Sequence, residues 1–327
     1  MIGCYVTGVL PRPERLIEVT RAYERGRVSK EELDRSFSEA TREVVDAQLK
    51  AEFSYVTDGM LRWQDLLRPF TENLNGVKIG ALTRWFNNNT FYRKPIVVGE
   101  IGGGGNITLG NTYVKFLPKK ASWKAILPAP YTFTKLSENL FYGSEVEFMF
   151  KYAQVVRNEL KTLAKAGFKY VQLSDPSLVY RIDERTISKS DLSLVKDALG
   201  EAVKGLPVRT CLQTFFGDFS KILPEALDFP VDHLGVDLYE TNLEELRKYE
   251  FNRGVALGIV DSRSSLLEDS DKLILLANEI IDSIYPSKTY DVLISPNCDL
   301  DFLPWRRAKE KMNVINSIVK ALRGDFN

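Results

Sequence analysis

The stretch Tyr170-Val171-Gln172-Leu173-Ser174-Asp175-Pro176 carries the pattern that decides the fold. Four mostly apolar residues form a strand candidate, and a polar turn that contains a proline ends it. A short apolar run of this kind is typical of a parallel strand that helices cover on its outer face. Helical patterns precede it near 145–166 and follow it near 189–204. The stretch therefore predicts one unit of an alternating strand–helix fold.

The same unit recurs from end to end of the chain. The other strand candidates are 4–7, 53–57, 123–127, 208–213, 234–238, 255–260 and 292–295, and the later helices are expected near 218–227, 243–249, 270–284 and 306–322. Eight units most simply close into a (β/α)8 barrel of the TIM type, in the α/β class. An open doubly wound sheet is the alternative, and the missing GxGxxG after the first strand disfavours it. We expect one domain over residues 1–327.

Two segments depart from the repeat. Helices are expected near 14–25 and 29–50, the second with Ser29 as N-cap and Glu32 completing a capping box. Residues 73–120 are expected to form an irregular, hairpin-like insertion that contains the glycine run 102–105. We interpret this run as a flexible hairpin tip, in preference to a phosphate cradle, because no GxxxxGK[ST] motif is present.

Bulk composition restricts the class of partner. Lys plus Arg and Asp plus Glu both number 44, so the net charge is +0. Such a balance disfavours a nucleic-acid partner, which requires a basic surface. Three cysteines are too few for a disulfide framework and indicate a reducing compartment. No apolar run is long enough to span a bilayer, and the N-terminus lacks a signal-peptide pattern, so we expect a cytoplasmic protein without a membrane partner.

Polar residues follow the predicted strands, at the end of the barrel where active sites lie. The candidates for binding a small molecule there are Arg12, Asp58, Ser174, Asp175, Asp237, Asp261 and Arg263. Each aspartate taken alone is as readily a helix N-cap. As a set they favour a small-molecule pocket at the mouth of the barrel.

Cys298 follows the last predicted strand, between Asn297 and Asp299. It is either a small buried hydrophobe or, at a strand end, a nucleophile or a ligand for a metal such as zinc. The only histidine, His233, precedes the apolar part of its strand and is expected near the opposite rim. The aromatic residues around Trp85 form either a stacking platform or part of the core.

Several of these segments resemble the cobalamin-independent methionine synthases, at the length of one barrel of those two-barrel enzymes. Residues 82–89, Leu-Thr-Arg-Trp-Phe-Asn-Asn-Asn, are similar to a Thr-Lys-Trp-Phe-Asp-Thr-Asn segment of the family's N-terminal barrel. Gln-Leu-Ser-Asp-Pro-Ser-Leu at 172–178 is similar to Gln-Ile-Asp-Glu-Pro-Ala-Leu. The same holds for 8–11, 92–96, 213–217, 257–263 and 295–298, whose family counterpart is Asn-Pro-Asp-Cys.

The resemblance implies a role in methionine biosynthesis, in which a methyl group passes from an N5-methyl, tetrahydrofolate-like pterin to the thiol of homocysteine. Zinc activates that thiol in the family. Cys298 matches the distal cysteine ligand, and the glutamate ligand falls on or near Asp237, with Glu240 close by. The His-x-Cys pair is expected after the strand at 208–213, where this chain has Thr214, Phe215 and Phe216. Two ligands are fewer than the three that a catalytic zinc requires.

The incomplete ligand set leaves three hypotheses. In the first, the chain is the N-terminal-type subunit of a split synthase and works with a separate zinc-bearing catalytic barrel. It would hold the pterin and its anionic tail through groups such as Arg12, Arg15, Trp85 and Arg93. In the second, the chain is a self-sufficient methyltransferase that uses Cys298 with Asp237 or Glu240 at an atypical metal site, and Asp175, Asp237 and Cys298 are its candidate catalytic residues. In the third, it is a non-catalytic binding protein.

Overall fold

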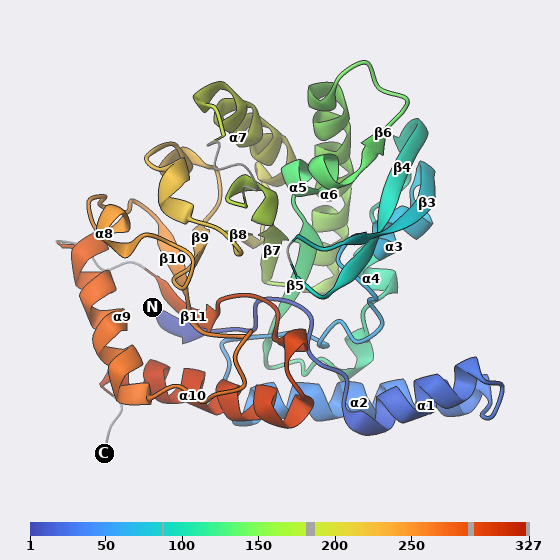
Figure 1. Ribbon diagram of the computed structural model, residues 1–327, viewed down its shortest axis with the longest axis horizontal. Coiled ribbons are helices and arrows are strands. Elements are labelled where there is room, and N and C mark those ends of the chain that lie inside the picture. Colours follow the sequence, from blue (N-terminus) through green and yellow to red (C-terminus); the bar gives the residue numbers. More distant parts are fainter. Residues whose placement is uncertain (87, 181–186, 287–290, 325–327) are drawn as a thin grey trace.

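The computed structural model describes residues 1–86, 88–180, 187–286 and 291–324. Eight parallel strands form one curved sheet, with helices around it (Figure 1). The strand order is β1-β11-β10-β9-β8-β7-β5-β2. These eight strands are the eight that the sequence predicts, so the (β/α)8 fold is confirmed. Their bounds are Ile2–Cys4 (β1), Tyr55–Val56 (β2), Ser122–Pro128 (β5), Tyr170–Ser174 (β7), Arg209–Gln213 (β8), His233–Asp237 (β9), Gly254–Val260 (β10) and Val292–Pro296 (β11).

The barrel is nearly closed, with a seam between β1 and β2, which are the two ends of the strand order. Ser54 bridges this seam. Its backbone amide donates to the Cys4 carbonyl at 3.0 Å, and its hydroxyl accepts from the Cys4 amide at 3.1 Å. β1 begins two residues earlier than predicted and β2 is shorter than predicted. Beyond β1, a hydrogen bond from the Tyr5 amide to the Ile294 carbonyl continues the pairing with β11. One serine therefore joins the two ends of the sheet.

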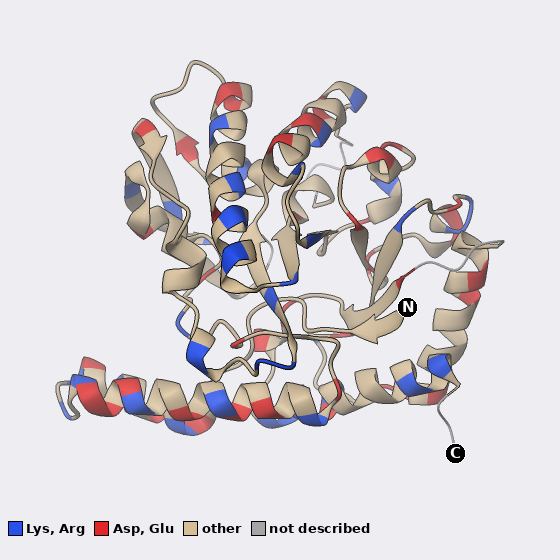
Figure 2. Cartoon of the chain, turned by 180° about the vertical axis from the view of Figure 1, so that it is seen from behind, with Lys and Arg blue, Asp and Glu red and all other residues tan. Residues whose placement is uncertain are grey.

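Helices cover the outer face of the barrel. The longer ones are α1 (Glu14–Glu24), α2 (Lys30–Lys50), α6 (Glu145–Ala166), α7 (Lys189–Val203), α9 (Ser270–Ile284) and α10 (Trp305–Arg323); the shorter ones are α3 (Arg68–Asn73), α4 (Ile107–Gly110), α5 (Pro130–Leu136) and α8 (Leu243–Leu246). The Ser29 hydroxyl accepts from the Glu32 amide, which confirms the predicted N-cap of α2. Charged residues lie along the helices (Figure 2). No described helix is long and apolar enough to cross a membrane.

One predicted helix is wrong, and another is shorter than predicted. Residues 218–227 form two short 3-10 helices, Phe219–Ile222 and Glu225–Asp228, because Pro224 between them has no amide hydrogen to continue a helix. The helix expected at 243–249 ends at Leu246, and only turn-like hydrogen bonds follow. Three further 3-10 turns complete the described part of the chain, at Val114–Phe116, Pro176–Leu178 and Leu300–Phe302.

The insertion is more regular than predicted. Strand β3 (Asn75–Arg84) pairs antiparallel with β4 (Phe91–Gly102), and β4 pairs with the short β6 (Glu138–Asn139). The hairpin turns between Arg84 and Phe91, where the described residues are 85, 86 and 88–90, so the prediction that the glycine run forms a tip is wrong. Gly103, Gly104 and Gly105 follow β4, and all three have positive φ. A Cβ on Gly104 would lie 2.9 Å from a Val155 methyl of α6, so the chain turns there in close contact with a helix.

Candidate functional site

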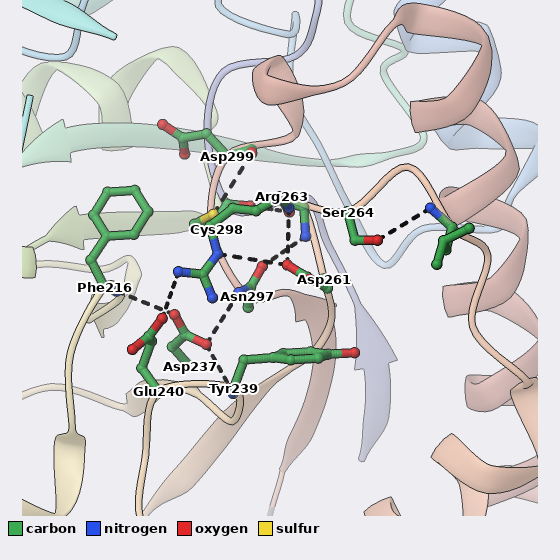
Figure 3. Close-up of polar contacts among 12 residues, drawn as sticks. Phe216, Asp237, Tyr239, Glu240, Asp261, Arg263, Ser264, Asn297, Cys298 and Asp299 are labelled. Carbon is green, nitrogen blue, oxygen red and sulfur yellow. Dashed lines mark hydrogen bonds and ion pairs between the residues drawn. The ribbon is translucent and has the colours of Figure 1, made fainter. Parts of the chain in front are cut away.

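The carboxylate of Asp237 is the hub of the strand-end centre (Figure 3). Asp237 is the last residue of β9 and is fully buried. Its Oδ1 accepts from the Tyr239 amide at 3.0 Å and from the Asn297 side-chain amide at 3.2 Å, and its Oδ2 accepts from the Phe216 amide at 3.2 Å. Burial raises the pKa of Asp237 to about 6, against these hydrogen bonds, which lower it. One side chain thus joins the loops after β8, β9 and β11.

Asn297 extends this network to a fourth loop. Its side-chain oxygen accepts from the Ser262 amide at 2.9 Å, in the loop after β10. The Ser262 hydroxyl donates to the Cys298 carbonyl at 2.9 Å. The side chains of Asn297 and Ser262 are both fully buried. The ends of four consecutive strands of the sheet are therefore linked by polar groups that point at one another.

Arg263 lies above this hub and contributes a positive charge to it (Figure 3). Its Nη1 is 2.5 Å from Glu240 Oε1, and its Nε is 3.7 Å from Asp261 Oδ1. Glu240 and Asp261 both keep some solvent exposure. Burial is the largest single effect on the pKa of Arg263 and lowers it, but the hydrogen bond to Glu240 and the nearby negative charges together raise that pKa above its ordinary value. The guanidinium therefore remains charged beside Asp237.

Cys298 is fully buried beside this hub. Its Sγ is 3.9 Å from the Asp299 carbonyl oxygen, to which the thiol donates. Burial raises the pKa of the thiol well above its ordinary value, and the nearby Asp299 and Asp237 raise it further. In the absence of a metal, these surroundings favour the neutral thiol of Cys298 over its thiolate.

Aromatic rings close the mouth of the barrel. Phe216, which follows β8, lies 5.8 Å from the ring centroid of Phe86 at the hairpin tip and 6.1 Å from that of Phe302. Phe86 in turn contacts Trp85 and Tyr180. Phe86 and Phe216 both have positive φ, 50° and 67°, a region that ordinary side chains rarely adopt. We call Phe86, Phe216 and Phe302 the aromatic plug.

A buried lysine lies inside the barrel, below the mouth. Lys124 on β5 donates to the Val6 carbonyl at 2.7 Å and to Gln172 Oε1 at 2.6 Å, and its Nζ is 3.2 Å from the Tyr5 ring centroid. Burial lowers its pKa well below the ordinary value. The sequence contained a signal for this residue, because a lysine inside an apolar strand candidate requires a buried partner.

The donor atoms at the centre do not fit a zinc ion. Among the residues that the structure describes, no three His, Cys, Asp or Glu side chains are grouped so that they could hold a metal. Both Asp237 oxygens already accept hydrogen bonds, Glu240 is paired with Arg263, and Phe216 presents a ring where the resemblance calls for a ligand. A catalytic zinc requires about three protein ligands. No step of a reaction is therefore assigned to a metal here.

A groove of about 530 Å³ lies beside the mouth, between the loop after β1 and the loop after β11. Trp63, Trp305 and Leu303 form part of its wall, with Arg12, Glu14 and Asp301 among the polar groups. Arg12 Nε donates to the Leu61 carbonyl at 3.0 Å, which fixes the guanidinium, and burial lowers its pKa. The volume of the groove is within the range of small-molecule sites.

The remaining candidates divide into those near the mouth and those away from it. Ser174 is the last residue of β7, and Asp175 follows it. The Ser174 hydroxyl accepts from Gln172, and the Asp175 carboxylate accepts from Thr132. Trp85 lies on the hairpin tip and lines a small cavity together with Asp299 and Asp301. These side chains all lie around the mouth of the barrel.

Three other predicted site residues lie outside the strand-end centre and contact other parts of the protein. The Asp58 carboxylate is buried and accepts from the Met60 and Tyr113 amides, so it joins the loop after β2 to the segment around Tyr113. Arg15 is exposed on α1 and faces Glu39 of α2. Arg93 lies within β4 of the hairpin, where its amide donates to Asp65. His233 begins β9 at the opposite end of the barrel, as predicted.

The sequence analysis missed residues whose role depends on tertiary contacts. Asn297 was noted only as a neighbour of Cys298, although it links two loops to Asp237. Phe216 was noted only as an absent ligand, although its amide and its ring both contribute to the centre. Trp63 and Trp305 gave no signal, since isolated tryptophans are typical of a core.

Comparisons with known proteins place this barrel in a family. Residues 3–321 match the family model "Cobalamin-independent synthase, Catalytic domain". A methionine synthase of Saccharolobus solfataricus is 30% identical over 326 residues, which is 98% of this chain and 95% of that protein. One from Sulfolobus acidocaldarius is 26% identical over 309 residues, 94% and 88% of the two chains.

Solved structures agree on the fold. A B12-independent methionine synthase from Shewanella sp. W3-18-1, in complex with selenomethionine, superposes with a TM-score of 0.80 at 19% identity, over 99% of this chain and 98% of that one. A putative vitamin-B12 independent methionine synthase from Listeria monocytogenes gives 0.72 at 15% identity, over 98% and 99%. The match to the family model over nearly the whole chain and the identity with a full-length relative together show that the chain belongs to the cobalamin-independent methionine synthase family.

Proposed function

We propose that this chain acts in cytoplasmic methionine biosynthesis as the accessory, N-terminal-type barrel of a methionine synthase. It would bind the N5-methyl pterin co-substrate, while a separate zinc-bearing barrel transfers the methyl group to homocysteine. The observation that carries the proposal is the Asp237 hub, whose oxygens are engaged by protein donors where the family requires a metal ligand.

The groove beside the mouth supports the pterin part of the proposal. A folate-like molecule has a flat apolar ring system with donor groups at one edge and an anionic tail. Trp63 and Trp305 give the groove an apolar wall, Asp301 and Glu14 offer acceptors, and Arg12 offers a fixed cation. A guanidinium held in place suits a carboxylate because it forms directed, charge-assisted hydrogen bonds.

The chemistry of transfer restricts what this chain contributes. The homocysteine sulfur must attack the methyl carbon as a thiolate, the carbon–nitrogen bond breaks, and N5 of the pterin takes a proton. The only described thiol at the centre, Cys298, is a buried neutral group of the protein itself. The proposal therefore assigns this chain binding and positioning of the co-substrate, and assigns activation of the homocysteine thiol to the partner.

A second candidate is a self-sufficient methyltransferase. The lengths of the two chains favour this candidate, because the match with the S. solfataricus methionine synthase covers 95% of that protein. The atypical site would consist of Cys298 with Asp237 or Glu240. A third reading, a non-catalytic binding protein, would be favoured by an empty apolar mouth, whereas this mouth holds the aromatic plug and the polar hub.

One assay separates the candidates. Methyl transfer from 5-methyltetrahydrofolate to homocysteine is measured with this chain alone, with a purified catalytic barrel of the same organism alone, and with both together. The accessory role predicts activity in the mixture well above the catalytic barrel alone, and none from this chain alone. Unchanged activity in the mixture contradicts it, and turnover by this chain alone establishes the second candidate.

Binding of 5-methyltetrahydrofolate to this chain alone is the companion measurement. The two tryptophans in the groove wall provide an intrinsic fluorescence signal. Saturable quenching is the expected result. Absence of quenching together with absence of heat in calorimetry would leave the pterin part of the proposal without support, and the third reading would then be preferred.

A further inference from the structure

We infer that the strand-end centre of this barrel is a metal-free latch, in which Asp237 ties together the loops that its relatives' metal would join. In this latch the backbone amides of Phe216 and Tyr239 and the side chain of Asn297 surround the carboxylate, and Arg263 supplies the positive charge. The inference concerns the architecture of the centre and does not depend on which function the chain performs.

The first argument is the direction of the donors around Asp237. Three N–H groups from three different loops point at its two oxygens, at 3.0 to 3.2 Å. A cation bound to the same carboxylate would face the positive ends of these dipoles. The donors therefore occupy three of the roughly four lone-pair positions of the carboxylate, and their positive ends disfavour a metal there.

The second argument is the position of the fixed charge. Arg263 is held between Glu240 and Asp261, with Nη1 2.5 Å from Glu240 and Nε 3.7 Å from Asp261 (Figure 3). Its own amide also donates to Asp261 Oδ1 at 2.9 Å. The guanidinium thus offsets part of the negative charge of the three carboxylates, and its fixed positive charge repels a divalent cation that would bind beside it.

The third argument is steric. The left-handed backbone of Phe216 turns its amide toward Asp237, and its ring contacts Phe86 of the hairpin and Phe302 of the loop after β11. The aromatic plug therefore rests on the latch. Cys298, which donates its thiol hydrogen to the Asp299 carbonyl, contributes a packed side chain to the same layer.

Zinc quantification of the full-length protein tests the metal-free part. The wild type and Cys298→Ser are incubated with zinc as the only metal, freed of excess ion, and analysed by mass spectrometry. We expect both to retain far less than one zinc per chain, and we expect zinc to leave the melting temperature unchanged. About one zinc per wild-type chain that is lost in Cys298→Ser would overturn the inference, because a site of this kind requires the thiolate.

A double-mutant cycle tests the latch. We expect Asp237→Ala and Asn297→Ala each to lower the melting temperature, and the double variant to fall little below Asp237→Ala, because both remove the same contact. Asp237→Asn replaces Asp237→Ala in the cycle if the latter does not fold. Additive losses would overturn the latch. The cycle uses this chain without pterin or partner, so its outcome is separate from that of the methyl-transfer assay.

Discussion

His233 provides a quantitative test of the barrel interior, because it is the only histidine in the chain. It is fully buried at the start of β9, 5.5 Å from the Tyr170 ring centroid, and neither ring nitrogen has a hydrogen-bond partner among the described residues. Burial, together with the smaller effect of the nearby Arg209, lowers its pKa from 6.5 to about 4. The folded state therefore binds a proton at His233 much more weakly than the unfolded state does.

The consequence for stability follows from linkage. A histidine whose pKa is lowered by folding hardly changes the free energy of unfolding above about pH 6.5, because it is neutral in both states. Below that pH the unfolded state binds a proton that the folded state does not, and this favours unfolding. With pKa values of 6.5 unfolded and about 4 folded, the loss of unfolding free energy is about 2 kcal/mol at pH 5 and near zero at pH 7.5. Stability is thus lost as the pH falls through this window, and the loss levels off below about pH 4.

The perturbation is His233→Phe, which keeps a ring and removes the titration. Urea unfolding of the wild type and the variant is measured at pH 7.5, 6 and 5. A change in packing shifts the difference between them equally at every pH, whereas the histidine term favours the variant by about 2 kcal/mol more at pH 5 than at pH 7.5. Tyr170→Phe, which removes a buried hydroxyl that does not titrate in this range, is the control. A difference that stays constant with pH, or a histidine NMR titration near 6.5, would refute the reasoning.

Three further outcomes follow from particular contacts. Gly104→Ala should cost about 1–2 kcal/mol of unfolding free energy, because its φ is +83° and the new methyl group would meet α6, whereas Gly110→Ala, in open space, should cost less; urea titration compares the two. Ser54→Ala should lower the unfolding free energy by about 1 kcal/mol and speed amide exchange in β1, since the hydroxyl closes the seam of the barrel; unchanged exchange would argue against that role. Arg12→Met should weaken 5-methyltetrahydrofolate binding about tenfold, while Arg15→Met, on the outer face of α1, should not; equal effects in calorimetry would exclude the groove.

The barrel was predictable because its strands are buried on both sides. β10, Gly254–Val260, is buried at all seven positions, and its apolar run is evident from the sequence alone. The hairpin was not predictable in the same way. Most side chains of β3 are exposed or half-buried on both faces, so no alternation of apolar and polar residues marks the strand. Regular structure that buries neither face leaves little trace in a hydrophobic pattern.

The candidate site was predictable as a location and not as a network. The rule that strand ends converge placed Asp237, Asp261, Arg263 and Cys298 around one mouth, and Figure 3 shows them there. The partners of Asp237 could not be inferred, because two of them are backbone amides. The amide of Phe216 reaches the carboxylate only through a left-handed φ of 67°, which no propensity for phenylalanine predicts.

The zinc site that the resemblance implies differs from the hydrogen-bonded carboxylate of this chain, and the cost of burying charge explains how both can occur in one fold. A carboxylate such as Asp237, fully buried at a strand end, requires compensation by a cation or by directed donors. The family resemblance implies that a metal supplies it in the catalytic barrel. Here three N–H donors contact the carboxylate and the guanidinium of Arg263 lies in the same centre, which is the compensation that the inferred latch relies on. The proposed role of holding a co-substrate for another barrel would use this mouth and the adjacent groove.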